Sequence, residues 1–257
     1  MKARPFILLL SLTVWSWVAP VLQAAGPELS AGFDAANKLY AQGKFAEAAR
    51  AYDQTLQQAA SSGTASAALF FNAGNAEFKL GQLGRAIASY RHAALLNPRD
   101  SEIQGNLDFV RNQVQGASVR PARWQNWISI LTLNEGTLLT AAAFWLCLGL
   151  WTARQLRPAL APRLRGFSLA ALLAAVLCGG ILAVQATAHF NPPTAVVIAA
   201  NSLARSGPFD DAQTVFAPHD GAELSVIDYH DDWVQVTDGS GKIGWLPRKL
   251  VALLPGA

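Results

Sequence analysis

Two long apolar runs, residues 136–153 and 167–188, constrain this chain more than any other feature of its sequence. Neither run contains an acidic or basic side chain, and each is about as long as the ~17–25 residues that a helix needs to cross a bilayer. The loop between them, residues 154–166, carries four arginines and no acidic residue. Because short arginine-rich loops stay in the cytoplasm, the sequence predicts a hairpin of two transmembrane helices with a cytoplasmic tip. The segments before and after the hairpin are then both expected on the outer side.

The N-terminal residues 1–25 have the pattern of a secretory signal peptide. A positive head with Lys2 and Arg4 precedes a short apolar core, and the small residues Ala24 and Ala25 follow it. An uncleaved membrane anchor is the alternative, because the residues before the cleavage position fit the small-residue rule poorly. Both alternatives carry the following segment to the outer side, in agreement with the arginine-rich loop.

Composition and charge exclude several classes of function. The net charge is only +3 and the basic residues form no stripe, so we expect no nucleic-acid binding. The two cysteines, Cys147 and Cys178, lie one in each apolar run, so the segments outside the membrane carry no disulfide framework. Neither run holds a charged residue, which argues against a transporter or an ion path.

A helical repeat is the main feature of residues 30–115. Residues 36–52 match residues 74–90 at a constant offset, with glycine, alanine and tyrosine at equivalent positions. Glycine permits the left-handed backbone of a sharp turn between helices, small alanines allow close helix approach, and the tyrosines fill the space between repeats. The pattern resembles the tetratricopeptide repeat, a stack of helix pairs. The equivalent pairs are Gly43 with Gly81, Ala48 with Ala86, and Tyr52 with Tyr90.

The resemblance implies a small concave groove lined by the first helix of each pair. Asparagine there can hydrogen-bond the backbone of an extended peptide, and aromatic side chains add contact area. The alternative is that Tyr40 and Phe78 pack against the next helix, as apolar residues at helical spacing usually do. An amphipathic helix expected at residues 101–115 would cap the stack with a polar outer face. The candidate groove residues are Asn37, Tyr40, Phe71, Asn75, Phe78 and Lys79.

Residues 116–135 lead to the first apolar run. We expect a linker followed by a helix at the membrane–water interface, because Trp124 and Trp127 combine an apolar ring with an N–H group that stays hydrated. The first transmembrane helix then begins near Glu135.

Residues 194–254 change to short β-strands with turns between them, which is typical of a small barrel. A Trp-Val-Gln-Val strand, an Asp-Gly-Ser-Gly turn and an Ile-Gly-Trp-Leu-Pro strand within residues 233–247 resemble the bacterial SH3 family. The resemblance implies binding of cell-wall or protein ligands. Trp233 and Trp245 can line a ligand groove or brace the barrel, and the area that an aromatic ring buries favours bracing. The His–Asp pairs on polar turns have no spacing typical of a metal site, so no metal is expected.

The sequence shows no constellation of catalytic residues. It contains no Gly-rich phosphate loop, no nucleophile elbow and no zinc-protease motif. We therefore expect that the protein is not an enzyme and needs no cofactor. The predicted fold class is a multidomain membrane protein with an all-α repeat domain, a two-helix transmembrane hairpin and a C-terminal all-β SH3-like barrel.

The order of these parts resembles the BatE-type proteins of the Bacteroides aerotolerance (Bat) family. The resemblance implies a scaffold in the bacterial inner membrane with both soluble domains in the periplasm. Its partners would be membrane proteins with von Willebrand A domains, served by a cytoplasmic MoxR-type ATPase, and its role would be tolerance of oxidative or envelope stress. The alternative hypothesis is a cell-wall anchor or sensor whose SH3-like barrel binds peptidoglycan.

Overall fold

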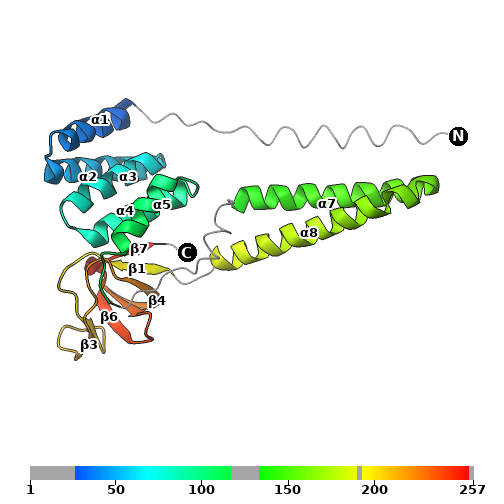
Figure 1. The fold of residues 1–257 in the computed structure, drawn as a ribbon. Helices are drawn as coiled ribbons and strands as arrows, with labels where there is room; N and C mark the ends of the chain where they lie inside the picture. Colours follow the sequence, from blue (N-terminus) through cyan, green and yellow to red (C-terminus); the bar gives the residue numbers. More distant parts are fainter. Residues whose placement is uncertain (1–26, 117–132, 190–192, 255–257) are drawn as a thin grey trace.

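The computed structural model describes residues 27–116, 133–189 and 193–254 of the chain (Figure 1). The predicted signal peptide and most of the predicted linker and interfacial helix lie outside these residues. The described residues form a helical body, a long two-helix hairpin and a C-terminal β-domain. Figure 1 shows the helical body and the β-domain stacked on each other beside the same end of the hairpin.

The helical body contains two stacked helix pairs and one further helix. The first pair packs against the second through the contact between the second and third helices. Side-chain caps mark two of the helix starts: Ser66 accepts a hydrogen bond from the N–H of Leu69, and Asp100 accepts from Glu102 and Ile103. The helices are α1 (Pro27–Ala41), α2 (Phe45–Ser62), α3 (Ala67–Lys79), α4 (Leu83–Leu96) and α5 (Ser101–Arg111).

The turn inside each pair is the same, which confirms the predicted repetition of helix pairs. Gly43 and Gly81 have left-handed φ angles of 75° and 74°. Residues with a Cβ are strained at these angles, which explains why glycine stands in both turns. In each turn the residue after the glycine donates its N–H to a carbonyl of the preceding helix. These bonds join Lys44 N to Leu39 O and Gln82 N to Glu77 O, both at 3.0 Å.

The alanines and tyrosines of the repeat lie where close packing requires them. Ala48 and Ala86 have no exposed surface, and Tyr52 and Tyr90 are each 1% exposed. The small alanine side chains bring neighbouring helices together, and the two rings fill the interior of the stack. The packing roles predicted from the sequence are therefore confirmed.

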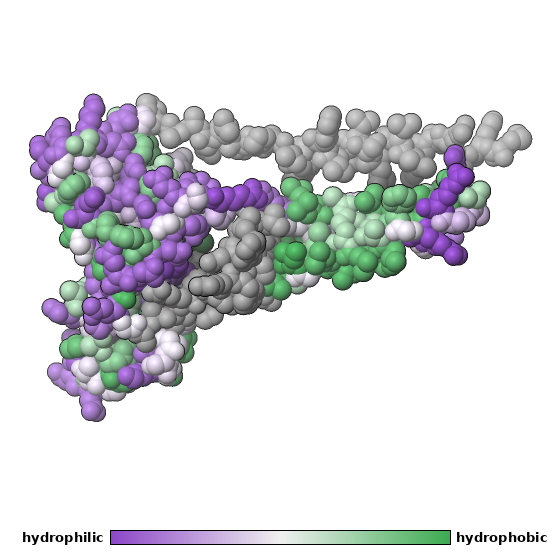
Figure 2. Space-filling model, viewed as in Figure 1, coloured by the Kyte–Doolittle hydropathy of each residue, from purple (hydrophilic) through white to green (hydrophobic). Residues whose placement is uncertain are grey.

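The hairpin consists of α7 (Leu133–Leu156), a 3-10 turn (Pro158–Leu160) and α8 (Ala161–His189). Both helices are long and apolar enough to span a membrane, and only 6% of each apolar window is buried. A core helix of a soluble protein would be mostly buried, whereas large exposed apolar patches mark membrane or protein contacts. Figure 2 shows this apolar belt, with hydrophilic residues at the far tip. The arginines at the tip are Arg154, Arg157, Arg163 and Arg165.

The β-domain is one antiparallel seven-stranded sheet in the order β3-β2-β6-β5-β4-β1-β7. Ala204 of β2 and Val251 of β7 come from opposite parts of this order, yet both belong to one buried cluster. The sheet therefore curls around its own core, as expected for a small barrel. The strands are β1 (Thr194–Val197), β2 (Ala204–Arg205), β3 (Thr214–Phe216), β4 (Glu223–His230), β5 (Trp233–Thr237), β6 (Ile243–Pro247) and β7 (Val251–Leu254).

The β-domain packs directly on α4 and α5 of the helical body. Val196 of β1 and Leu254 of β7 share a buried cluster with Ile87 of α4 and with Leu107 and Val110 of α5. On α5 the predicted apolar residues Ile103, Leu107 and Val110 are buried, whereas Glu102 and Asp108 are exposed, which confirms an amphipathic last helix with a polar outer face. The two soluble parts form a single body with a continuous apolar interface.

Glycine at position 84 permits the close approach of the two parts. A Cβ atom on Gly84 would overlap the carbonyl oxygen of Val197. The N–H of Gly84, in the first turn of α4, donates to Asp220 Oδ1 at 3.2 Å. Burial raises the pKa of Asp220, and backbone N–H groups at the start of the helix partly oppose that shift.

Candidate functional site

Three buried charged side chains join the helical body to the β-domain. Glu223 at the start of β4 is 1% exposed and lies between Arg91 of α4 and Arg111 of α5. Its carboxylate accepts hydrogen bonds from Arg91 Nη1 at 3.0 Å and from Arg111 Nε and Nη2 at 2.6 and 2.8 Å. Burial lowers the pKa of Arg91, and the neighbouring carboxylate opposes that shift. The contact leaves the β1–β7 side of the β-domain unavailable to an external ligand.

The predicted groove asparagines are held by equivalent tyrosines in the two repeats. Tyr52 Oη donates to Asn37 Oδ1 at 2.6 Å, and Tyr90 Oη donates to Asn75 Oδ1 at 2.7 Å. Burial raises the pKa of Tyr52 to about 12 and moves the pKa of Tyr90 in the same direction, so both hydroxyls stay protonated donors. Each tyrosine thus fixes the orientation of one asparagine amide.

A second asparagine completes each of these contacts. Asn72 Nδ2 donates to Asn37 Oδ1 at 3.0 Å, and Asn106 Nδ2 donates to Asn75 Oδ1 at 3.2 Å. We call these four residues the asparagine ladder. The Nδ2 groups of Asn37 and Asn75 have no hydrogen-bond partner among the described residues, so they can donate to the backbone carbonyls of a bound peptide.

The three aromatic candidates, Tyr40, Phe71 and Phe78, are all partly buried against the cores of the helical body. Phe78 makes an edge-on contact with Phe109 of α5 at a centroid distance of 5.8 Å, and Phe109 is 59% exposed. Tyr40 contacts Phe45 of the next helix in the same way, at 5.2 Å. Phe71 packs against the buried ring of Tyr90, and both Phe71 and Phe78 lie partly buried against the same apolar cluster.

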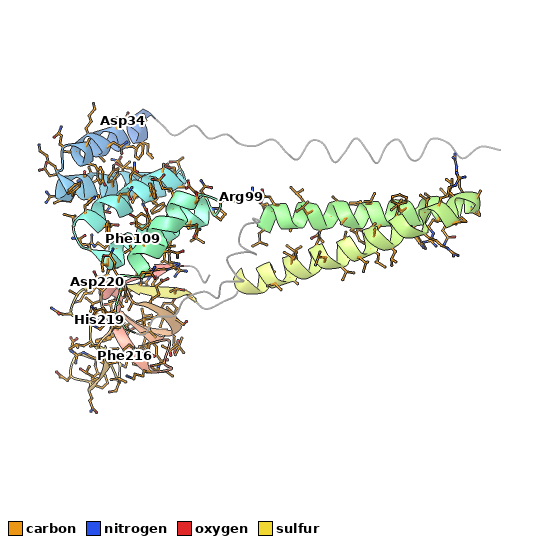
Figure 3. The ribbon with its side chains drawn as sticks, viewed as in Figure 1. Asp34, Arg99, Phe109, Phe216, His219 and Asp220 are labelled. Carbon is orange, nitrogen blue, oxygen red and sulfur yellow. The ribbon has the colours of Figure 1, made fainter. Side chains whose placement is uncertain are left out.

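The structure therefore gathers Asn75, Phe78, Asn106 and Phe109 on neighbouring parts of α3 and α5, with exposed Lys79 beside them. Figure 3 labels Phe109 among the helices of the helical body. Sequence reasoning missed Asn106 and Phe109, although a signal was present. An asparagine followed three positions later by an aromatic residue occurs in α1, α3 and α5 alike.

The two candidate tryptophans of the β-domain lie on the outer face of its central strands. Val234 and Leu246 of β5 and β6 point into the core, so the alternating residues face outward. Trp245 pairs with Gln235, and Trp233 pairs with Pro247, which makes the two rings diagonal neighbours. Both tryptophans are partly exposed, so they line an outer aromatic face rather than bracing the core.

A pocket of about 450 Å³ lies where the end of the helical body meets the β-domain. Its lining combines apolar groups such as Phe216 with the polar His219, which Figure 3 places close to Asp220 at the junction of the two parts. The docking of the two parts creates this pocket, because residues of both line it. The lining residues are Gln115, Gly116, Val215, Phe216, Ala217, Pro218, His219, Asp238, Ser240 and Lys242.

Metal ligation has no candidate within the part of the chain that the structure describes. No group of three or more His, Cys, Asp or Glu side chains there is arranged to hold an ion. Asp220, which the sequence pairs with His219, contributes to the contact with α4 instead.

A curled antiparallel sheet with an open aromatic face defines a small binding module of the SH3-like class. In agreement, the family model described as bacterial SH3 domain matches residues 199–252. The match covers β2 to β6 and the first part of β7, and it is consistent with binding of a protein or of peptidoglycan. No curated protein matches the chain.

Proposed function

We propose that the chain is a non-catalytic scaffold of the bacterial inner membrane whose helical body holds an extended segment of a protein partner outside the cytoplasm. The asparagine ladder carries this proposal. Two buried tyrosines fix two asparagine amides at equivalent positions, and each amide keeps a donor for the backbone of a ligand. Fixing side chains in advance lowers the entropy cost of binding.

The aromatic pair beside the ladder supports a peptide rather than a small polar ligand. Phe78 and Phe109 offer apolar contact area next to the amide donors, and Lys79 adds a positive charge at the same place. The resemblance to tetratricopeptide repeats agrees with this mode of binding. The resemblance to the Bat family favours membrane proteins with von Willebrand A domains as partners, and a role in oxidative or envelope stress tolerance.

The membrane hairpin and the predicted signal peptide support the proposed location. The arginines at the tip of the hairpin favour a cytoplasmic tip, which leaves the helical body and the β-domain together on the periplasmic side. The bacterial SH3 match agrees with a module that works in the cell envelope.

Pull-down of the full chain from detergent-solubilised membranes tests the scaffold. Phe109→Ser should reduce recovery of von Willebrand A partners at least tenfold, because it removes half of the exposed aromatic pair. Phe209→Ser is the matched control, since Phe209 of the β-domain is 57% exposed and Phe109 is 59% exposed. Equal recovery with both variants would contradict the groove, and failure to recover any such partner would contradict the partner assignment.

Peptidoglycan binding by the β-domain is the second candidate, and the open face around Trp233 and Trp245 favours it. Aromatic faces bind sugars and stem peptides through their large flat area. Sedimentation of the full chain with purified cell wall should then be lost with Trp245→Ala and kept with Phe209→Ser. Sedimentation that does not depend on Trp245 would remove this candidate.

A further inference from the structure

One ion pair connects the helical body to the start of the membrane hairpin. Arg99, in the turn between α4 and α5, lies 2.7 Å from Glu135 in the first turn of α7. Figure 3 shows Arg99 on the side of the helical body that faces α7. The uncharged run of α7 begins with the next residue, Gly136, so Glu135 marks the edge of the apolar belt.

Two exposed leucines lie immediately before this turn. Leu95 is 50% exposed and Leu96 is 52% exposed, at the C-terminal end of α4. Leu95 and Leu96 precede Arg99 by four and three residues. Even a fully extended chain of that length would place their Cα atoms no more than about 11–14 Å from the Cα atom of Arg99. The polar interface on each side of a bilayer core is about 5–8 Å thick, so a leucine near this turn can reach the interface.

We propose that the α4–α5 turn is a membrane-contacting foot, in which Leu95 and Leu96 enter the outer-leaflet interface while Arg99 stays at the level of the lipid headgroups. The partner is the lipid of the same membrane that α7 and α8 span, so this inference rests on the membrane anchoring in the proposed function. Continuity with α7 through the Arg99–Glu135 pair favours lipid over a protein partner as the occupant.

The foot gives the soluble body a fixed orientation. The helical body and the β-domain are one unit through the contacts of Glu223, so a foot on α4 positions both. The groove at Phe109 and the outer face with Trp233 and Trp245 are then held at fixed distances from the membrane surface. A scaffold that holds membrane partners gains from such positioning, because fewer orientations remain to be lost on binding.

Depth-dependent quenching of a single fluorophore tests the foot in the full chain. Cys147→Ala and Cys178→Ala remove both native cysteines, and Leu96→Cys then accepts an environment-sensitive dye. The protein is placed in phosphatidylcholine and phosphatidylglycerol vesicles that carry a nitroxide near the headgroup. Leu80→Cys is the matched control, since Leu80 is 37% exposed and lies in the turn between α3 and α4, before the opposite end of the 14-residue α4, which is about 20 Å long.

The dye at position 96 should be quenched at least threefold more than the dye at position 80. Arg99→Glu should reduce this difference, and Arg99→Glu combined with Glu135→Arg should restore it. Equal quenching at both positions, in protein that floats with the vesicles, would overturn the foot alone. A dye at position 96 that is shielded only when a protein partner is added would also overturn it. Protein that does not float would overturn the membrane anchoring and the foot with it.

Discussion

Removal of the Glu223 carboxylate should separate the β-domain from the helical body. This carboxylate accepts three charge-assisted hydrogen bonds from Arg91 and Arg111, and all three residues are buried. Glu223→Ala leaves two guanidinium groups buried without their common partner. The variant then either keeps the two guanidinium charges in the interface without the carboxylate between them or opens the interface to water.

The free-energy cost of Glu223→Ala can be estimated from comparable buried ion pairs. Breaking a buried ion pair by removing one partner costs about 3–5 kcal/mol. Since about 1.4 kcal/mol corresponds to a factor of ten, the equilibrium constant for opening the interface should rise by about 140-fold to 3,700-fold. The matched control is Asp108→Ala, because Asp108 also contacts Arg111 but at 3.8 Å and with its side chain 66% exposed. Such exposed pairs contribute about 0–1 kcal/mol.

Amide hydrogen exchange in lipid nanodiscs measures this opening directly. Amides of β1, which pairs with β4 and β7 and packs on α4, should exchange at least 100 times faster in Glu223→Ala than in the native chain. Replacing Arg91, Arg111 and Glu223 together by apolar residues of similar size should restore slow exchange of the β1 amides, because no buried charge then remains in the interface. Less than a tenfold change in Glu223→Ala, or an equal change in Asp108→Ala, would refute the reasoning.

Other substitutions test the remaining contacts. Gly84→Val should open the same interface, because its side chain would overlap Val197, and faster exchange in β1 with unchanged α1 would show it. Burial raises the pKa of Glu77 from its ordinary 4.5 to about 7. The protonated carboxyl group therefore contributes fully to the free energy of unfolding below about pH 4.5, and this contribution is lost as the pH rises through 7. At pH 8, Glu77→Gln should therefore raise the free energy of unfolding by up to about 3 kcal/mol, measured by denaturant unfolding. At pH 4 the substitution should not raise it. Tyr90→Phe removes the donor that fixes Asn75 and should weaken partner binding about five- to tenfold in the pull-down, with helicity by circular dichroism unchanged.

The helical repeats could be predicted because their signals are local. Glycine in the left-handed turns and alanine and tyrosine at equivalent positions depend on neighbours within one helix pair, so they show in the sequence as a matched pattern. The strands of the β-domain follow the same rule, since Leu224 and Val226 alternate with more polar positions and are both buried.

The contact between the two soluble parts could not be predicted in this way. Glu223 meets Arg111 and Arg91 across 112 and 132 residues, with the membrane hairpin in between. A glutamate at the start of an alternating strand resembles an ordinary surface residue until the partner arginines are placed beside it. The same is true of Gly84. Its position excludes a side chain only because the carbonyl group of Val197, far away in the sequence, lies against it.

The groove was predicted in part for a related reason. The asparagines at positions 37 and 75 stand at equivalent places in the matched repeats, whereas Asn106 and Phe109 of α5 lie outside the two matched segments. The asparagine–aromatic spacing recurs in α5 without the matched glycine, alanine and tyrosine pattern that marks the two repeats, so it did not show as a third copy.

Cysteine accessibility in intact spheroplasts tests most directly whether both soluble parts share the outer side of the membrane. In a chain with Cys147→Ala and Cys178→Ala, single cysteines replace exposed Ser61 of the helical body, Ser240 of the β-domain or Ala159 at the hairpin tip. A membrane-impermeant maleimide should label positions 61 and 240 in intact spheroplasts and position 159 only after permeabilisation. Labelling of 61 and 240 from opposite sides would contradict the account, because the Glu223 contact requires both in one compartment.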